Sequence, residues 1–452
     1  MKSSEDSRII RLALPSIVQN ITVPLLGLAD LAIVGHMGSA RYIAAVSVGT
    51  MIFNVMYWLL GFLRMGTSGM TSQALGRRDF PAVMGILRQT LLLGGFIALG
   101  FIVLQVPIRW IALRTMLPSS ELAAFQLLSS NTDPSLASLV ITYFNICVWG
   151  APAVLCLYGL TGWFIGMQNT RLPMLVAVGQ NLLNIAFSLF FVFGLGMKME
   201  GVALGTLVAQ WSGLLLALFL WWRYYGRRSV LRHPVKMMSY RRFFSVNRDI
   251  FLRTVCLVAV NLFFTAAGSR QGELLLSVNT LLMTLFMLFS YVMDGFAFAG
   301  EALCGRYYGA HNQSAFLQVV QRLFVWGGVM VVLFTLVYAF GGESFLGLLT
   351  NEQSVILAAR PYFWWAVLVP VIGVAAFIYD GVFIGITATR GMLFSCSIAT
   401  AAFFLLHFLL FPLIGNHSLW IALLTYMALR GSLQALWLRR IQSIAFSSSK
   451  HS

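Results

Sequence analysis

The chain has 452 residues, of which 59% are hydrophobic and only 10% charged, and its mean hydropathy is +0.84. A soluble domain carries about 25% charged residues, so this composition excludes a water-soluble enzyme, a coiled coil and a disordered regulator. The net charge of +16 would suggest a nucleic-acid partner on a soluble chain. Here nine basic residues between Arg223 and Arg253 face a single acid, Asp249, and supply half of the excess. A basic run between apolar segments is typical of a cytoplasmic loop, so we expect a membrane protein with no nucleic-acid partner.

Polar and turn-forming residues divide the sequence into twelve apolar segments, each long enough for the roughly 20 residues of a spanning helix. Six precede the basic run, at residues 8–36, 42–74, 83–110, 137–160, 170–195 and 200–222. Six follow it, at residues 250–270, 274–302, 316–341, 356–386, 390–413 and 417–438. An even number of spans puts both termini on one side, and the arginine-rich loops fall on that side too. We therefore expect both termini to be cytoplasmic in a cytoplasmic (inner) membrane.

The predicted fold is an all-α polytopic membrane protein in three parts. Residues 1–222 form an N-terminal six-helix lobe, residues 223–249 a basic cytoplasmic linker loop, and residues 250–452 a C-terminal six-helix lobe with a short tail. No small-residue cleavage site precedes a short apolar core at the start, so we expect the first segment to remain as a span. Function is then expected within the bilayer.

An internal repeat relates the two halves at a constant offset of 219 residues. Tyr143-Phe144 matches Tyr362-Phe363, Gly162-Trp-Phe-Ile-Gly166 matches Gly381-Val-Phe-Ile-Gly385, and Thr170-Arg171 matches Thr389-Arg390. A weaker similarity relates the sequences that follow the second and eighth spans. The matching spans are the fourth and the tenth, so the two halves have the same orientation in the membrane. They are then related by an axis along the membrane normal. Two such pseudo-twofold-related bundles with a central cleft are typical of alternating access. A channel would more naturally use a ring of subunits, and a membrane enzyme needs no duplication.

Four acids lie inside predicted spans, where a charge is costly and marks a candidate functional site: Asp30, Asp294, Glu301 and Asp380. Asp30 is isolated, since its nearest charged neighbours in sequence are Arg11 and Arg41. Such a carboxyl could bind and release a proton or hold a sodium ion. The alternative is a protonated acid that hydrogen-bonds to a neighbouring helix.

The other three acids belong to the second half. Asp294 and Asp380 could face each other or a cationic ligand, or be purely structural. Glu301 is expected to pair with Arg306 or Arg322, and Arg64 in the second span receives no role. Methionine and aromatic side chains, Met287 among them, could line an adaptable cleft for bulky apolar ligands.

Neutral polar residues gather near the end of the first half. Asn181, Asn184 and Ser188 lie at positions i, i+3 and i+7, so they share one helix face, and Thr206 in the sixth span can join them. Neutral oxygens around a single carboxylate suit a proton or small-cation site, although ordinary hydrogen bonding between helices would use the same residues. Pro15 and Pro24 precede Asp30 and permit the first span to bend.

Motifs for other activities are missing from the sequence. There is no GxxxxGK[ST] phosphate loop, so we do not expect ATP to drive transport, and neither HExxH nor a histidine cluster favours a metal site or a hydrolase. We expect no cofactor apart from a coupling ion, H⁺ or possibly Na⁺.

Several segments resemble the multidrug and toxic compound extrusion (MATE) family over essentially the whole chain. The first span carries Leu12-Ala-Leu-Pro15, Val23-Pro-Leu-Leu-Gly-Leu-Ala-Asp30 and Gly35-His-Met-Gly38. The segments that resemble its DinF branch are Tyr291-Val-Met-Asp-Gly-Phe-Ala-Phe-Ala-Gly-Glu301, Tyr379-Asp-Gly-Val-Phe-Ile-Gly385 and Leu413-Ile-Gly-Asn-His-Ser-Leu-Trp420. The resemblance implies two six-helix lobes that export organic compounds in exchange for protons or sodium.

The resemblance also implies roles for individual residues. Asp30 would be the principal coupling carboxyl, with Asn184 and Thr206 as partners and Tyr143 as a less certain companion. Pro15 matches the proline at which the first span is thought to bend. Members often carry a second acid where this chain has Ser188, and the loss of that carboxyl favours protons over sodium.

We therefore predict an antiporter of amphipathic, often cationic compounds that works as a monomer among membrane lipids, with Asp294 and Asp380 shaping the cavity of the second lobe. A flippase for a lipid-linked saccharide is the alternative, but it would line its cleft with several arginines, and Arg64 is the only clear candidate. A membrane-embedded transferase would need a catalytic loop rich in acids or histidine, and none stands out.

Overall fold

The computed structural model describes residues 2–37, 39–116, 135–226, 236–350 and 352–445, and all regular structure in these ranges is helical. Twelve helical segments in them are long and apolar enough to cross a membrane, which confirms the predicted number of spans. The helices of the first half are α1 (Lys2–Gly35), α2 (Ala40–Leu59), α3 (Phe62–Gly76), α4 (Phe80–Val103), α5 (Gln105–Met116), α7 (Leu136–Cys147), α8 (Ala151–Gly166), α9 (Arg171–Leu189) and α10 (Met199–Trp221). Those of the second half are α11 (Tyr240–Ser269), α12 (Glu273–Gly309), α13 (Gln313–Leu349), α14 (Gln353–Ala359), α15 (Phe363–Gly385), α16 (Thr389–Ile414) and α17 (His417–Ala445).

Some helix ends differ from the expected ones. The seventh span begins at Tyr240 instead of residue 250, so part of the predicted linker is helical, while residues 227–235 of that linker lie outside the described ranges. The second span is interrupted at Leu60-Gly61, which separates α2 from α3. Hydropathy places a span but does not show where its helix starts in the interfacial region, because helix ends depend on packing and capping.

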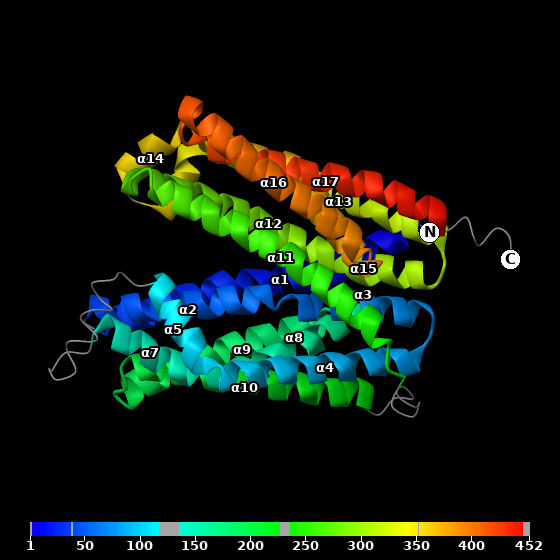
Figure 1. Cartoon of the computed structure of the whole chain (residues 1–452), viewed down its shortest axis with the longest axis horizontal. Helices are drawn as coiled ribbons and strands as arrows, with labels where there is room; N and C mark the ends of the chain where they lie inside the picture. The colour runs from blue at the N-terminus through cyan, green and yellow to red at the C-terminus, as the bar shows by residue number, and fades with distance from the viewer. Residues whose placement is uncertain (1, 38, 117–134, 227–235, 351, 446–452) are drawn as a thin grey trace.

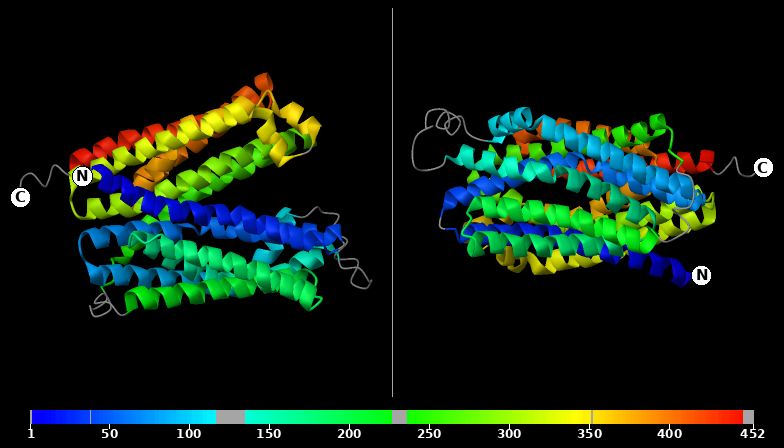
Figure 2. Two further views of the ribbon diagram at one scale, coloured as in Figure 1. Left: turned by 180° about the vertical axis from the view of Figure 1, so that it is seen from behind. Right: turned by 90° about the horizontal axis from the view of Figure 1, so that it is seen from below.

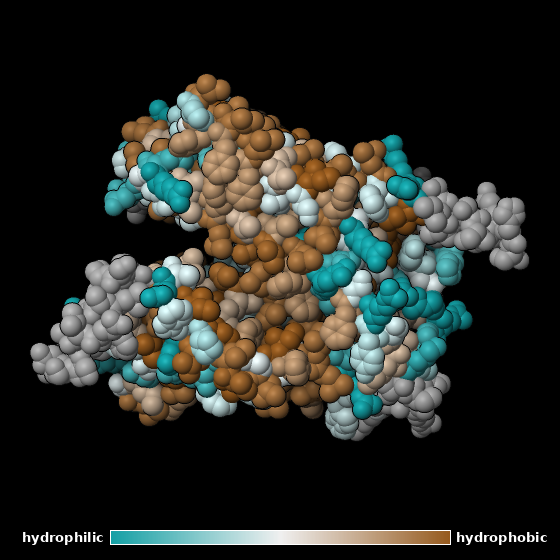
Figure 3. All heavy atoms as spheres, in the orientation of Figure 1, coloured by the Kyte–Doolittle hydropathy of each residue, from teal (hydrophilic) through white to brown (hydrophobic). Residues whose placement is uncertain are grey.

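The helices form two bundles that meet at one end and diverge at the other (Figures 1 and 2). One bundle contains α2 to α10 and the other α11 to α17, while α1 lies between them and packs against both α12 and α9. The bundles meet at the end where α1 begins and α17 ends, which we call the termini end. At the opposite end the space-filling view shows a deep notch between them (Figure 3).

The internal repeat is visible in the backbone. Four non-glycine residues of the described chain have positive φ, and they form two pairs: Gln168 and Thr387, 219 residues apart, and Arg78 and His311, 233 residues apart. Each follows a helix end, and the amide of the next residue bonds a carbonyl five residues back, as Asn169 does to Phe164 and Ala388 to Phe383. Such left-handed residues satisfy the last carbonyls of a helix. The two halves therefore repeat their turns as well as their spans.

The helices α3 and α12 cross in backbone contact where the two bundles meet. A Cβ added to Gly76 would overlap the carbonyl oxygen of Arg306, and one added to Gly309 would overlap that of Gln73. The residues of each contact are again 233 positions from their counterparts, so this crossing lies on the pseudo-twofold axis. Only glycine permits such a close approach of two helices.

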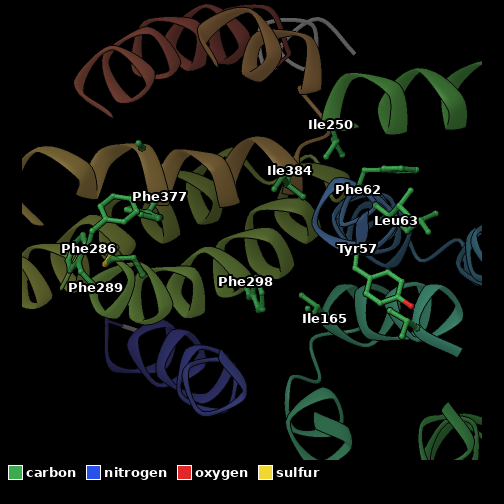
Figure 4. Packing of buried hydrophobic residues seen from close by; sticks show 14 of the residues in the cluster. Tyr57, Phe62, Leu63, Ile165, Ile250, Phe286, Phe289, Phe298, Phe377 and Ile384 are labelled. Carbon is green, nitrogen blue, oxygen red and sulfur yellow. The ribbon is translucent and has the colours of Figure 1, made fainter. Parts of the chain in front are cut away.

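Buried apolar side chains fill both bundles and the junction between them (Figure 4). In the second bundle the rings of Phe289 and Phe377 pack edge to face with centroids 5.8 Å apart. Phe62 and Ile384, from different bundles, lie near each other at the junction. The outer surface is also apolar, as the broad hydrophobic band in Figure 3 shows, and this is expected for helices that face lipid.

Candidate functional site

Asp30 lies on α1, the helix between the two bundles. α1 remains one continuous helix through Pro15 and Pro24. The Asp30 side chain is half-buried, and its buried Oδ1 atom has no hydrogen-bond partner among the described residues. A buried carboxylate oxygen without a partner is costly, so this group is suited to bind a cation.

The predicted polar partners form a hydrogen-bonded group of their own. Asn184 Nδ2 donates to Thr206 Oγ1 at 3.2 Å, and Ser188 Oγ donates to Asn184 Oδ1 at 3.4 Å. The structure thus brings three of the predicted residues together, on α9 and α10. No hydrogen bond joins this group to Asp30 within the described chain. The site is therefore divided between an acid on α1 and neutral oxygens on α9 and α10.

The remaining two first-lobe residues bind elsewhere. Asn181 Nδ2 donates to the carbonyl oxygen of Thr22 at 3.2 Å, which joins α9 to α1 eight residues before Asp30. The Tyr143 hydroxyl hydrogen-bonds to Thr50 Oγ1 at 3.2 Å. Asn181 therefore joins α9 to α1, and Tyr143 joins α7 to α2.

A row of side chains follows one face of α12 towards the junction of the bundles. Met287, Asp294, Phe298 and Glu301 are spaced by seven, four and three residues, so they share a face. The guanidinium of Arg64 from α3 lies over the Phe298 ring, 4.1 Å from its centroid, and pairs with Glu301 at 3.2 Å. Glu301 also accepts a short hydrogen bond from Ser68 Oγ. The row therefore ends in a buried ion pair between the two bundles.

Two further contacts close the termini end, and they are related by the pseudo-symmetry. Gln73 Nε2 donates to Thr387 Oγ1 and to the Gly385 carbonyl, each at 2.9 Å. Arg306 Nη1 donates to Gln168 Oε1 at 2.6 Å. Gln73 and Arg306 are equivalent in the repeat, as are Gln168 and Thr387. We call these contacts, together with the pair of Arg64 and Glu301, the inter-lobe seal.

Asp380 lies in the interior of the second bundle. Its Oδ2 atom accepts hydrogen bonds from Arg253 of α11 and Arg430 of α17, and Gln434 Nε2 donates to Oδ1 at 2.8 Å. All four side chains are buried. The carboxylate therefore binds two cations that belong to the protein, and it holds α11, α15 and α17 together.

Comparison with known proteins identifies the family. The MatE family matches residues 15–190 and 250–413. The DNA damage-inducible protein F of Escherichia coli K12 is 38% identical over 445 residues, which is 97% of this chain and 93% of that protein. This chain is a member of the MATE family.

More distant relatives and solved structures agree with this MATE assignment. The probable multidrug resistance protein NorM of Thermotoga maritima is 21% identical and covers 77% of this chain, with 73% of its own length matched. A crystal structure of a MATE protein in the bent conformation superposes with a TM-score of 0.82 at 20% identity, over 99% of this chain and 97% of the other. A MATE family transporter in an outward-facing conformation superposes with a TM-score of 0.74 at 20% identity, over 98% of this chain and 96% of the other. This chain therefore has the MATE fold and is a transporter, not an enzyme.

One expectation about the acids of this MATE protein was wrong. Glu301 pairs with Arg64 instead of Arg306 or Arg322, because α3 crosses α12 at that level. For Asp380 the sequence left a cationic ligand and a structural role open, and its pairs with two guanidinium groups favour the structural role. Asp294 lies on α12, which packs against α15, and its side chain is half-buried.

The sequence analysis also missed two arginines. Arg253 was assigned to the basic run, and Arg430 was overlooked inside the last predicted span, so Arg64 was wrongly taken as the only mid-span arginine. Arg430 carried a usable signal, because a lone cation within an apolar span requires a buried partner. The internal repeat gave no hint of either residue.

Proposed function

We propose that this MATE transporter is a proton-coupled secondary exporter of amphipathic, often cationic organic compounds, and that Asp30 carries the coupling ion. The observation that supports this proposal most directly is the isolation of Asp30. It lies on the helix between the lobes, and its buried oxygen has no hydrogen-bond partner among the described residues. A solution cation can therefore occupy it, and its occupancy can respond to an ion gradient.

Protons are favoured over sodium by the neighbouring groups. Transporter sodium sites use several oxygen ligands, commonly backbone carbonyls of unwound helices. Here α1 is a continuous helix, Ser188 stands where related proteins often have an acid, and Asn184 Oδ1 already accepts from Ser188. A single half-buried carboxyl is sufficient for a proton.

The substrate cavity would lie along the α12 face. Met287 offers adaptable apolar contact, and the half-buried Asp294 offers a negative charge for a cationic group. Asp380 would shape this cavity indirectly, by fixing the helices around it. Relatives that are named multidrug resistance proteins, in Thermotoga maritima and Klebsiella pneumoniae, support this substrate class.

Alternating access follows from the two ends of the molecule. The termini end carries the arginine-rich segments, so we assign it to the cytoplasm of a bacterial inner membrane. The conformation is then open to the outside and closed inside by the inter-lobe seal. Protonation of Asp30 would let α1 bend at Pro15 and Pro24, and closing the outer notch would require the seal to open.

The flippase alternative is less well supported by the arginine positions. Its cleft would need guanidinium groups that are free to bind a pyrophosphate. Within the described ranges, Arg64 is paired with Glu301, and both Arg253 and Arg430 are buried against Asp380.

The test uses inside-out vesicles energised with a proton gradient, to which a cationic dye is added. Wild type should dissipate the gradient on addition of the dye, and Asp30→Asn should not. Asp79→Asn is the matched control, because Asp79 caps α4 and asparagine is an equally good cap. If wild type transports the dye with a sodium gradient but not with a proton gradient, sodium and not the proton is the coupling ion. Full proton-driven transport by Asp30→Asn would refute the role of Asp30, and silence with both ions would favour the flippase.

A further inference from the structure

A cavity of about 1370 Å³ surrounds the first turns of α11 at the termini end. Phe62 and Leu93 of the first lobe contribute to its wall, and so do Thr387, Arg390 and Trp437 of the second. The cavity therefore lies across the junction of the lobes, on the opposite side of the seal from the notch. An occupant would contact both lobes at once.

The polar part of this cavity is strongly basic. Four arginines line it: Arg241, Arg242, Arg248 and Arg390. Its single acid, Asp249, has a side chain only 1% exposed and accepts from Arg248 at 2.9 Å and from Thr389 at 3.1 Å. The Arg248 side chain remains 64% exposed in that pair, so further donors of its guanidinium are accessible. The cavity has a formal excess of three positive charges, which suits an anion and opposes the organic cations proposed for the notch.

The rest of the wall is apolar and extends along the span. Phe244 lies beside the arginines with half of its surface exposed, and Phe251 lies about two turns deeper on the same helix. Phe62, Leu93 and Trp437 complete this wall. Arginines at the membrane boundary above an aromatic wall match a molecule with an anionic head and a hydrocarbon tail. A small inorganic anion would leave the aromatic wall uncovered.

We propose that this cavity binds an anionic phospholipid of the cytoplasmic leaflet. The phosphate contacts Arg241, Arg248 and Arg390, and an acyl chain lies along Phe62 and Phe251. The assignment of the leaflet rests on the orientation given under Proposed function. Since Thr387 both lines the cavity and accepts from Gln73 in the inter-lobe seal, the lipid stabilises the conformation in which the termini end is closed.

The test measures lipid binding on purified full-length protein in a neutral detergent. Phosphatidylglycerol and phosphatidylcholine with identical acyl chains are titrated, and binding is followed by native mass spectrometry and by melting temperature. Phosphatidylglycerol should bind and raise the melting temperature, while phosphatidylcholine should not. Arg241→Gln/Arg390→Gln should bind phosphatidylglycerol at least about tenfold more weakly, since each arginine near an anionic lipid contributes about 1 kcal/mol.

A matched control comes from the internal repeat. Arg171 is the counterpart of Arg390, is equally exposed at the start of α9, and lies outside the cavity wall. Arg171→Gln should leave phosphatidylglycerol binding unchanged, whereas Arg390→Gln weakens it and Arg390→Lys retains most of it.

Three results would overturn the proposal: equal binding of the two lipids, equal losses for Arg171→Gln and Arg390→Gln, or an equal rise in melting temperature with inorganic phosphate alone. Because no transport is measured, the outcome is independent of the role of Asp30. Asp30→Asn should bind phosphatidylglycerol like wild type.

Discussion

Two acids of this transporter, Asp30 and Asp380, have opposite surroundings. Asp30, on the helix between the lobes, has a buried oxygen with no hydrogen-bond partner in the described part of the chain, whereas Asp380 in the second lobe binds two guanidinium groups. Glu301 at the junction is intermediate, with one arginine as its partner. In the proposed function, the number of internal cations decides whether an acid is available to a solution ion.

The physical reason is the desolvation of charge. An ionised carboxylate away from water needs a counter-ion or it becomes protonated. Asp380 has its counter-ions permanently within hydrogen-bonding reach, so an ion gradient has little effect on it. In the proposed function Asp30 takes its cation from solution, so a gradient can change its protonation. A duplicated fold can therefore keep one lobe as a rigid support and use the other for coupling.

The largest effect on stability is expected from Asp380→Asn. It leaves Arg253 and Arg430 buried without a counter-ion, and removing one partner of a buried ion pair typically costs about 3–5 kcal/mol of unfolding free energy. Thermal unfolding in detergent should show a much lower melting temperature. Asp30→Asn removes no ion pair, so its unfolding free energy should change by less than about 1 kcal/mol.

The same comparison can be sharpened with a second substitution. Adding Arg253→Gln to Asp380→Asn restores the net charge of the buried group and should recover part of the lost stability. Equal melting temperatures for Asp380→Asn and Asp30→Asn would contradict the distinction between the two acids.

A smaller effect is expected from Glu301→Gln, which leaves Arg64 without its counter-ion at the junction. We expect a shift of about tenfold towards the conformation that is open at the termini end, equivalent to about 1.4 kcal/mol. Distances between spin labels at positions 78 and 311 would measure it. The control is Arg322→Gln, whose pair with Asp6 at 3.6 Å is partly exposed and weak. Unchanged distances in Glu301→Gln would show that the pair of Arg64 and Glu301 does not help to hold the termini end closed.

The smallest effect is expected from Thr206→Val, which keeps the shape but removes the acceptor of Asn184 Nδ2. A typical hydrogen bond contributes about 1 kcal/mol, so proton-driven dye transport should slow by roughly fivefold. Thr265→Val is the control, because Thr265 is exposed and bonds only a carbonyl of its own helix. Equal rates for both variants would show that the group around Asn184 does not support coupling.

Much of the fold could be predicted because the relevant signals are local. Each of the twelve spans is a continuous apolar segment, and lipid forces such a segment to satisfy its own backbone as a helix. The repeat at residues 143–174 and 362–393 predicted parallel halves, and the paired left-handed turns of Gln168 and Thr387 follow from the same residues. Asn184 and Ser188 were placed on one face from their spacing alone, and they do bond each other.

The sequence by itself therefore determined the membrane class, the number of spans, the duplication and the isolation of Asp30 among distant charges. Only the tertiary structure decided which acid receives a cation from the protein. Arg64 and Glu301 are 237 residues apart, and Arg253 lies 127 residues from Asp380. Their pairing depends on how α3, α11 and α17 cross their neighbours. Packing across the whole fold sets those crossings, and no local pattern of residues contains that information.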